Sequence, residues 1–241
     1  FEAADMNKVI EYADLVIAEG YGLDSDYFNT FSNSAANNSV IFASAEGTPQ
    51  NRWYMTLHYD QNPSGWNGFT TLADFYNSFE AGDARLGTAA TPDSSEFSGI
   101  GTGFLKGEQM NDNGDVIKNS RQGGIALSFS ENIKLAGAKT DEGIRVIKYH
   151  PGNFGNYIFL RFADVWLMKA EAIMRGGTSS DAALDMVNTL RSARGTSPLT
   201  ALDEAAMLAE RGRELYWEGI RRTDQIRFGQ FSSTWSDKTN A

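Results

Sequence analysis

The sequence predicts a mainly α-helical protein built from helical hairpins, with a loop-rich insertion that contains short strands. Two observations lead to this fold class. Apolar residues recur at helical spacing in a first segment, residues 1–20, and again throughout residues 157–229. Residues 21–156 instead combine glycine, asparagine and serine turns with short extended runs. We therefore treat residues 1–241 as a single region, ending in a tail at 230–241 whose weak periodicity predicts fraying.

The first helix is predicted for residues 2–19, with Gly20 just past its end. One face carries the apolar side chains of Met6, Val9, Ile10, Ala13, Val16 and Ile17. The helix starts almost at the first residue, without a capping segment or a leader. We interpret the chain as a fragment whose N-terminal part is missing, with a mature chain start as the alternative.

The loop-rich segment holds short elements separated by turn signals. Ser39 to Ala43 is predicted as a buried strand or an extended stretch, Asn62 to Gly65 as a turn and Thr71 to Phe79 as a short helix. Asn113-Gly114 lies between two extended runs, which predicts a hairpin with a type I′ turn. Further short strands are expected between residues 125 and 149.

The helical region begins with a helix predicted from Ile158 to Met174, which Gly176-Gly177 ends. Its polar side chains trace one narrow stripe, formed by Arg161, Asp164, Glu171 and Arg175. Because the rest of its circumference is apolar, neighbouring helices must cover it on two sides.

Two more helices follow at short intervals. The second ends at Gly195 and has two candidate caps, Ser179 and Ser180. The third opens on the S/T-x-x-acid arrangement of Thr200 and Asp203 and is predicted to run to about Tyr216 or Gly219. Paired helices of this length fit tetratricopeptide-like packing.

Carboxylates in the third helix recur every four residues, at Glu210, Glu214 and Glu218. Residues at this spacing share a helix face, so the like charges repel and need cationic partners. Guanidinium groups hold carboxylates in bidentate pairs, which fixes geometry as well as charge. We predict a structural ion network made of Glu210, Arg211, Glu214, Glu218, Arg221, Asp224 and Arg227.

Three segments of the helical region, RFADVWLMKAEA, ALDMVNTLRSARG and ERGRELYWEGIRRTDQIRFG, resemble the C-terminal signature of the SusD/RagB family of outer-membrane glycan-binding lipoproteins. That family's run is acid-Arg-x-x-Glu-Leu-x-x-Glu-Gly-x-Arg-x-x-Asp-x-x-Arg, and Glu210 to Arg227 match every fixed place. One departure is Arg222-Thr223, where family members often have an aromatic residue, and it affects local packing.

The resemblance implies a SusD-like α–α superhelix and a non-enzymatic role in starch or glycan utilisation. In that role the protein captures an oligo- or polysaccharide at the surface of a Bacteroidetes-type outer membrane for nutrient uptake. It delivers the glycan to a SusC-like TonB-dependent transporter. Attachment to the membrane would use a lipidated N-terminus that this chain lacks. The alternatives are a tetratricopeptide-type protein-interaction scaffold and a glycoside hydrolase.

Composition narrows the choice of partners. The chain has 31 acidic and 21 basic residues, a net charge of −10, which argues against nucleic acid or an anionic membrane surface as the main partner. A neutral ligand such as a sugar is compatible with this charge. Cysteine is absent, so the sequence offers no disulfide framework and no thiolate site.

Aromatic residues crowd residues 53–79. Phe75, Tyr76 and Phe79 have helical spacing, which predicts core packing. Four other aromatic residues lie among polar and glycine residues instead: Trp53, Tyr54, Tyr59 and Trp66. A sugar ring has an apolar C–H face, which aromatic rings can cover, and a hydroxylated rim, which polar side chains can bind. We predict that the glycan-binding residues are Trp66, Asn67, Tyr59, Trp53, Tyr54, Asp60 and Gln61. Buried packing of Trp66 is the alternative.

Catalytic and metal sites are not expected. Glycosidases place two carboxyls across a cleft, about 5 to 9.5 Å apart, whereas the glutamates here are interleaved with arginines on one helix. Asn111, Asn113 and Asp115 mimic the start of a calcium loop, but its twelfth position would be Gln122, so a simple turn is favoured. The two histidines lie far apart in the sequence. We expect neither a metal nor a cofactor.

Overall fold

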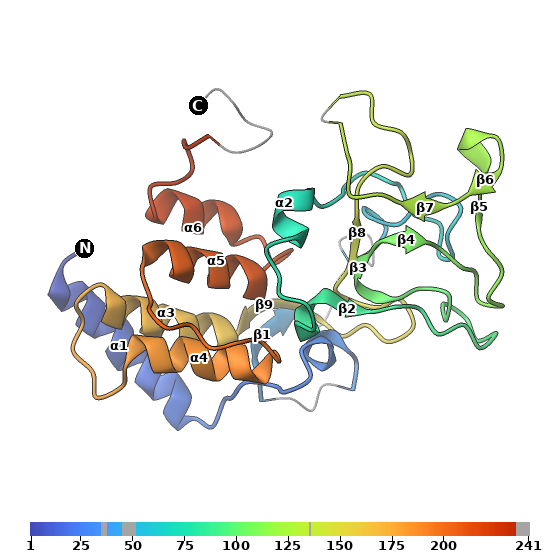
Figure 1. Cartoon of the computed structure of the whole chain (residues 1–241). Coiled ribbons are helices and arrows are strands. Elements are labelled where there is room, and N and C mark those ends of the chain that lie inside the picture. The colour runs from blue at the N-terminus through green and yellow to red at the C-terminus, as the bar shows by residue number, and fades with distance from the viewer. Residues whose placement is uncertain (35–37, 45–51, 135, 235–241) are drawn as a thin grey trace. The chain divides into compact units, whose positions relative to one another are not determined.

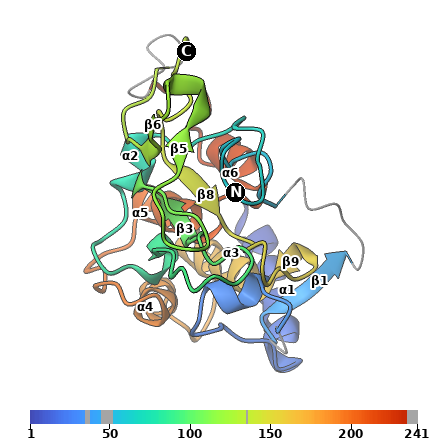
Figure 2. The same ribbon diagram turned by 90° about the vertical axis from the view of Figure 1, so that its right-hand side faces the viewer.

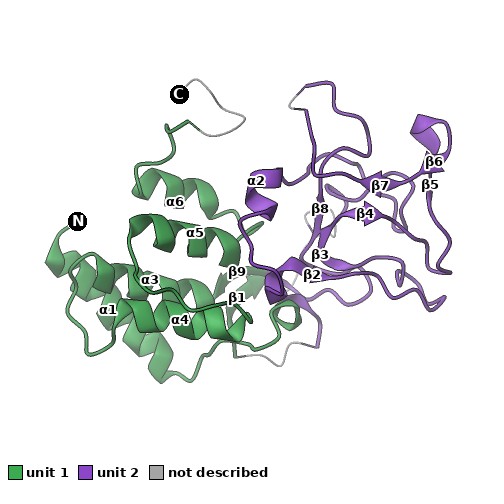
Figure 3. Cartoon of the chain, viewed as in Figure 1, with its two compact units in different colours: residues 1–30, 36–44, 158–241 green, residues 31–35, 45–157 purple. Residues whose placement is uncertain are grey.

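The computed structural model describes residues 1–34, 38–44, 52–134 and 136–234 (Figure 1). The chain divides into two compact units (Figure 3). Unit 1 contains residues 1–30, 36–44 and 158–241, and unit 2 contains residues 31–35 and 45–157. Unit 1 is mainly α-helical, whereas unit 2 is built from loops and short strands. The described part of the chain is therefore a mixed structure, and the predicted mainly α class holds for unit 1 only.

Among its described residues, unit 1 contains one two-stranded sheet and five α-helices. Strand β1 (Val40–Ser44) pairs with β9 (Tyr157–Arg161), of which all but Tyr157 lies in this unit. The helices are α1 (Ala3–Ala18), α3 (Phe162–Met174), α4 (Ala183–Ala193), α5 (Glu204–Glu214) and α6 (Arg221–Arg227). The helix predicted for residues 2–19 is confirmed as α1.

Helix α3 lies at the centre of unit 1 because α1, α4 and α5 all pack against it. The main apolar core joins α3, α4 and α5 with the residue that follows α6, and it consists of Ala163, Leu167, Ala170, Met186, Val187, Leu190, Met207, Leu208 and Phe228. A smaller cluster joins α1 to α3 through Met6, Ile10 and Ala172. The prediction that neighbours cover this helix is confirmed, but its polar stripe is buried as well: Asp164 and Glu171 are each 5% exposed.

The helix predicted from Ile158 begins four residues later, at Phe162, because residues 157–161 form strand β9. The run Ile158, Phe159 and Leu160 is compatible with either structure by periodicity, and pairing with β1 decides it. The rings of Phe42 and Phe159 stack at 5.7 Å on this sheet. Strand β1 itself was expected to be buried, which is wrong, since Phe42 is exposed.

The predicted helix caps need correction. Helix α4 starts after Ala182 with no side-chain cap, because Ser179 Oγ accepts a hydrogen bond from Asp181 N instead, at 3.1 Å. Neither Ser179 nor Ser180 caps it. In α5 the cap is Asp203 rather than Thr200: its carboxylate accepts a hydrogen bond from Ala206 N at 2.8 Å. Helix α5 ends at Glu214, and the separate helix α6 follows.

Within the residues that the structure describes, unit 2 contains one short α-helix, α2 (Ala73–Tyr76), and two 3-10 helices, Ala84–Leu86 and Ser120–Gln122. Its strands are β2 (Gly87–Thr88), β3 (Thr102–Leu105), β4 (Gly107–Glu108), β5 (Lys118–Asn119), β6 (Ile125–Ala126), β7 (Ser128–Phe129) and β8 (Arg145–Ile147). Strands β2, β3 and β8 form an antiparallel sheet and β4 pairs with β7 (Figure 1), while β5 pairs with β6 (Figure 2). The short strands expected between residues 125 and 149 are confirmed.

Helix α2 is one turn of the helix predicted for Thr71 to Phe79. The rings of Phe75, Tyr76 and Phe79 all contact Phe104 on β3, with centroid distances of 6.2, 5.7 and 5.2 Å. Phe79 is buried, and the other two predicted core residues are half-buried.

The hairpin predicted at Asn113-Gly114 is present as an antiparallel bridge between Met110 and Val116, but its turn is not type I′. A type I′ turn needs positive φ at both central residues, and only Gly114 has it, at 84°. The side chain of Asn111 explains this difference, because its Oδ1 accepts hydrogen bonds from Asn113 N and Asp115 N and forms the turn itself.

Candidate functional site

The predicted glycan-binding residues lie in unit 2, where residues 65–69 fold back against residues 54–58. Three backbone hydrogen bonds fix the register: Trp66 N donates to Tyr54 O at 2.6 Å, Asn67 N to Leu57 O at 2.9 Å and Phe69 N to Met55 O at 2.9 Å. Gly65 permits this approach, since a Cβ there would lie 2.0 Å from Leu57 O. This folding brings Trp66 beside Tyr54, twelve positions earlier in the chain.

Trp66 and Tyr54 form a stacked aromatic pair. Their ring centroids are 6.0 Å apart and their planes differ by 18°. Trp66 is 53% exposed, and Tyr54 is half-buried beneath it. The alternative of Trp66 as a buried core residue is therefore wrong. A flat, exposed indole supported from below can cover the C–H face of a sugar ring.

Asn67 supports this pair instead of lying free to bind a ligand. Its Oδ1 accepts hydrogen bonds from Arg145 Nε and Nη2, at 3.1 and 2.7 Å, and its Nδ2 donates to Thr140 O at 3.0 Å. It also has a left-handed backbone, with φ of 52°. Arg145 is buried and donates to three further carbonyl oxygens, at Thr140, Glu142 and Gly143. Burial lowers the pKa of Arg145 to about 10, which leaves it charged at neutral pH.

The two other predicted polar residues are also engaged within the protein. Asp60 accepts hydrogen bonds from Ser120 N at 2.9 Å and Ser120 Oγ at 2.7 Å. Gln61 is buried, with Oε1 accepting from His58 N and Nε2 donating to Gln109 Oε1. The expectation that Asn67, Asp60 and Gln61 present free groups to a sugar is therefore not met, because each already hydrogen-bonds distant loops.

Trp53 and Tyr59 do not extend the exposed aromatic pair. Trp53 is 4% exposed and packs edge-to-face on Phe154, with centroids 4.7 Å apart, so it belongs to the core of unit 2. Tyr59 is half-buried, and the guanidinium of Arg121 lies over its ring at 4.2 Å. Phe69, which the site prediction omitted, is 52% exposed three residues after Trp66. The sequence did contain a signal for it, because Phe69 ends the segment HYDQNPSGWNGF, residues 58–69, which combines aromatic and polar side chains.

The predicted ion network lies in unit 1, and each of its three glutamates is bound by at least one arginine from another element. Glu214 is fully buried and lies 2.8 Å from Arg161 Nη1 and 3.0 Å from Arg194 Nη2. Glu218 lies beyond the end of α5, not on its face, and binds Arg161 Nε at 2.7 Å. Glu210 is held by Arg191 and Arg213, each at 2.7 Å.

A second group of ion pairs joins α3, α5 and α6. Arg211 binds Asp164 at 2.8 Å and Asp224 at 2.9 Å. Arg227 binds Asp224 at 2.7 Å and Glu171 at 2.9 Å. Arg221 was predicted to join the network, but its Nη1 donates to the carbonyl oxygen of Leu208 at 2.6 Å.

Sequence reasoning missed several members of this network, namely Arg161, Asp164, Glu171, Arg191 and Arg194. The signal was present, because Arg161 opens the segment RFADVWLMKAEA and the segment ALDMVNTLRSARG contains both Arg191 and Arg194. Their partners in α5 could not be assigned without the fold.

The network holds charge in place and does not supply acid–base chemistry. Burial raises the pKa of the Glu171 carboxyl, but hydrogen bonds from Arg227 and Arg175 outweigh it and keep that pKa below its usual range. Burial raises the pKa of Asp164, against the lowering effect of Arg211. Glu210 and Glu214 are both fully buried, so no cleft opens between them for a glycosidic bond.

Two features are absent from the part of the chain that the structure describes. No group of three or more histidine, aspartate or glutamate side chains is placed to hold a metal ion. No helix is both long and apolar enough to cross a membrane.

Comparison with known proteins shows similarity to one family. The SusD family model matches residues 136–241. A SusD-like protein of Formosa agariphila is 27% identical over 219 residues, which cover 79% of this chain and 42% of that protein. The starch-binding protein SusD of Bacteroides thetaiotaomicron is 38% identical over 73 residues, 30% of this chain and 13% of that protein. Residues 136–241 therefore match the SusD family, and the chain covers less than half the length of these relatives.

Solved structures establish the same fold. Surface glycan-binding protein A from Bacteroides thetaiotaomicron has a TM-score of 0.68 at 18% identity, with 99% of this chain and 54% of that chain aligned. A structure of that protein in complex with laminarihexaose gives 0.66 at 18% identity and the same coverage. A SusD-like protein from Bacteroides fragilis gives 0.64 at 18% identity, covering 93% and 51%. These likenesses describe a SusD-like fold.

Proposed function

We propose that this chain is the glycan-binding part of a cell-surface protein that captures an oligo- or polysaccharide without cleaving it. The observation that carries the proposal is the exposed indole of Trp66, stacked on Tyr54 and held in place by the hydrogen bonds of Asn67 and Arg145. A rigid aromatic face binds a sugar at little cost in conformational entropy. Phe69 extends the exposed aromatic surface.

The comparisons support this class of function. Two relatives have names that describe starch or surface glycan binding, and one of these was solved with laminarihexaose. We further propose that the whole protein is lipid-anchored at the outer membrane and passes its glycan to a SusC-like TonB-dependent transporter. A glycoside hydrolase is disfavoured because the buried glutamates are locked by arginines.

The test replaces the exposed indole. Trp66→Ala should weaken retention by a bound polysaccharide in affinity electrophoresis by at least about tenfold, because an aromatic anchor carries much of the binding free energy. The free energy of unfolding should fall by about 1 kcal/mol or less, since the ring is half-exposed.

Phe159→Ala is a matched control, since Phe159 is an aromatic residue of similar exposure, 54%, in unit 1. Its retention should equal that of the unmodified chain. Unchanged retention for Trp66→Ala would refute the assigned surface, and release of reducing sugar from the same glycans would refute the non-enzymatic role. A tetratricopeptide-type scaffold would instead capture an envelope protein that free oligosaccharide fails to displace.

A further inference from the structure

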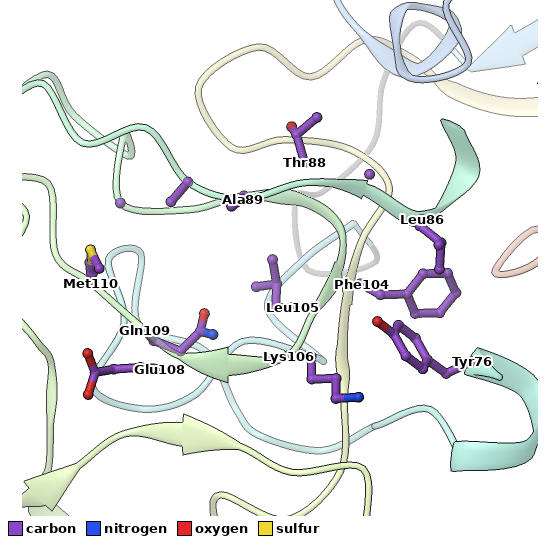
Figure 4. A pocket seen from close by; sticks show the side chains of 14 residues that line it. Tyr76, Leu86, Thr88, Ala89, Phe104, Leu105, Lys106, Glu108, Gln109 and Met110 are labelled. Atoms are coloured by element: carbon purple, nitrogen blue, oxygen red, sulfur yellow. The ribbon is translucent and has the colours of Figure 1, made fainter. Parts of the chain in front are cut away.

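Apart from the exposed Tyr54–Trp66 pair, unit 2 contains a pocket of about 440 Å³ between the loop after β2 and strand β4 (Figure 4). This volume is within the range of about 300 to 1,000 Å³ that is typical of small-molecule sites. The pocket shares no lining residue with the Tyr54–Trp66 pair. The sequence pattern gave no indication of it.

The two ends of this pocket differ in chemistry. Figure 4 shows the rings of Tyr76 and Phe104 beside Leu86 at one end, with Glu108 and Gln109 at the other. Tyr76 and Phe104 meet edge-to-face with centroids 5.7 Å apart, so the apolar end is rigid. Gln109 is fixed as well, because its Nε2 donates to Gly107 O at 2.9 Å.

Charged groups at the pocket offer both a donor and an acceptor. Lys106 Nζ lies 4.8 Å from the ring centroid of Tyr76 and 3.1 Å from Glu131 Oε1, which leaves further N–H groups for a ligand. The side chain of Glu108 is exposed and makes no hydrogen bond or ion pair with any residue that the structure describes. Its carboxylate can therefore accept hydrogen bonds from an incoming group.

We propose that this pocket is a second carbohydrate site, which takes a short neutral saccharide or the end of a glycan chain. A polyhydroxylated ring can donate to Glu108, accept from Lys106 and place its C–H face on the aromatic end. A cationic ligand would meet Lys106 and an anionic ligand would meet Glu108, so a neutral ligand fits the pair best. The inference rests on the proposed function only for its choice of carbohydrate as the ligand class.

The experiment is a titration of the isotope-labelled chain with maltohexaose and with laminarihexaose, followed by the amide signals of residues 106–110. It is run on the unmodified chain, on Trp66→Ala, and on Trp66→Ala combined with Ala89→Trp. Ala89 lines the pocket and is exposed, so an indole there should occupy it without disturbing the core. Ala138→Trp, at an exposed alanine outside the pocket lining, is the matched control in the same Trp66→Ala background.

In the Trp66→Ala chain, one of the saccharides should still shift the signals of residues 106–110. The shifts should disappear with Ala89→Trp and persist with Ala138→Trp. If these signals stay fixed at about 10 mM saccharide, an upper limit for weak binding, the second site is refuted. This result is distinguishable from a failure of the proposed function. If the Tyr54–Trp66 surface does not bind glycan, Trp66→Ala would leave the saccharide-induced shifts of residues 54 and 66 unchanged. Shifts that survive Ala89→Trp would also overturn the assignment.

Discussion

His58 is a fully buried histidine in unit 2, and its surroundings favour the neutral ring. Its Nδ1 accepts a hydrogen bond from Asp60 N at 3.2 Å, which requires an unprotonated nitrogen. Burial lowers the pKa of His58, although the nearby carboxylate of Asp60 opposes that shift. Folding therefore makes this residue harder to protonate.

This burial predicts a loss of stability in mild acid. Because the folded-state pKa lies below the unfolded value of about 6.5, the unfolded chain takes up the proton first. The free energy of unfolding should therefore fall as the pH drops below about 6.5, by at most about 1.4 kcal/mol per pH unit. Urea unfolding between pH 7 and about pH 5, above the range of most carboxylates, measures it.

His58→Gln should flatten this pH dependence, and His150→Gln, which replaces the other histidine, should preserve it. An equally steep decline in His58→Gln would show that another group is responsible.

For single residues, the sequence identified the exposed indole but not the hydrogen bonds that its polar neighbours already make. Trp66 and Tyr54 were named from residue type alone, since aromatic rings among glycine and polar residues are candidates for a surface site. Asn67 and Asp60 had the same polar character, yet their hydrogen-bond partners, Arg145 and Ser120, lie 78 and 60 residues further along the chain. Only the fold shows that these side chains are already satisfied.

The elements of unit 1 are joined through buried charge as much as through apolar packing. Glu214, the last residue of α5, binds Arg161 at the end of β9 and Arg194 just after α4. Replacing Glu214 removes a carboxylate that pairs with two buried guanidinium groups, although Arg161 keeps its pair with Glu218. The structure therefore predicts a strong coupling between these three elements.

Glu214→Ala should lower the free energy of unfolding by about 3 kcal/mol or more, because breaking a buried ion pair leaves uncompensated charge. Alanine preserves helix propensity, so the loss reflects the missing carboxylate. Denaturant unfolding followed by the helical circular dichroism signal gives the value.

The matched control is Glu204→Ala at the opposite end of α5. Its side chain is 62% exposed and pairs with Arg175 at 2.5 Å, and exposed pairs contribute about 1 kcal/mol or less. Equal losses in the two variants would contradict the distinction between buried and exposed pairs.

Helix positions were predictable where periodicity and glycine signals agreed, as at α1 and at the end of α3, where Gly176 adopts φ of 99°. They were not predictable where a distant segment decides the structure. The pattern of residues 158–160 is compatible with a helix, but these residues form a strand because β1, more than one hundred positions earlier, pairs with them. The predicted caps of α4 were wrong for a similar reason. Ser179 Oγ accepts a hydrogen bond from Asp181 N instead, and the Asp181 carboxylate pairs with Lys169 on α3.

Over the whole molecule, the net charge of −10 contrasts with the neutral ligand that we propose. The carboxylates of Glu210 and Glu214 are buried with their arginine partners, and stacking on Trp66 involves no charge. Salt screens interactions between exposed charges but leaves contact between an indole and a C–H face almost unaffected. Ionic strength therefore separates aromatic recognition from electrostatic attraction.

We predict that the dissociation constant for a neutral glycan changes by less than about twofold between roughly 20 and 500 mM sodium chloride. An anionic polysaccharide fragment of equal length should bind more weakly at low salt, because the acidic protein repels it, and this penalty should shrink as salt is added. Isothermal titration calorimetry at several salt concentrations measures both series. A steep loss of neutral-glycan affinity with salt would mean that charged groups, rather than the Tyr54–Trp66 pair, dominate binding.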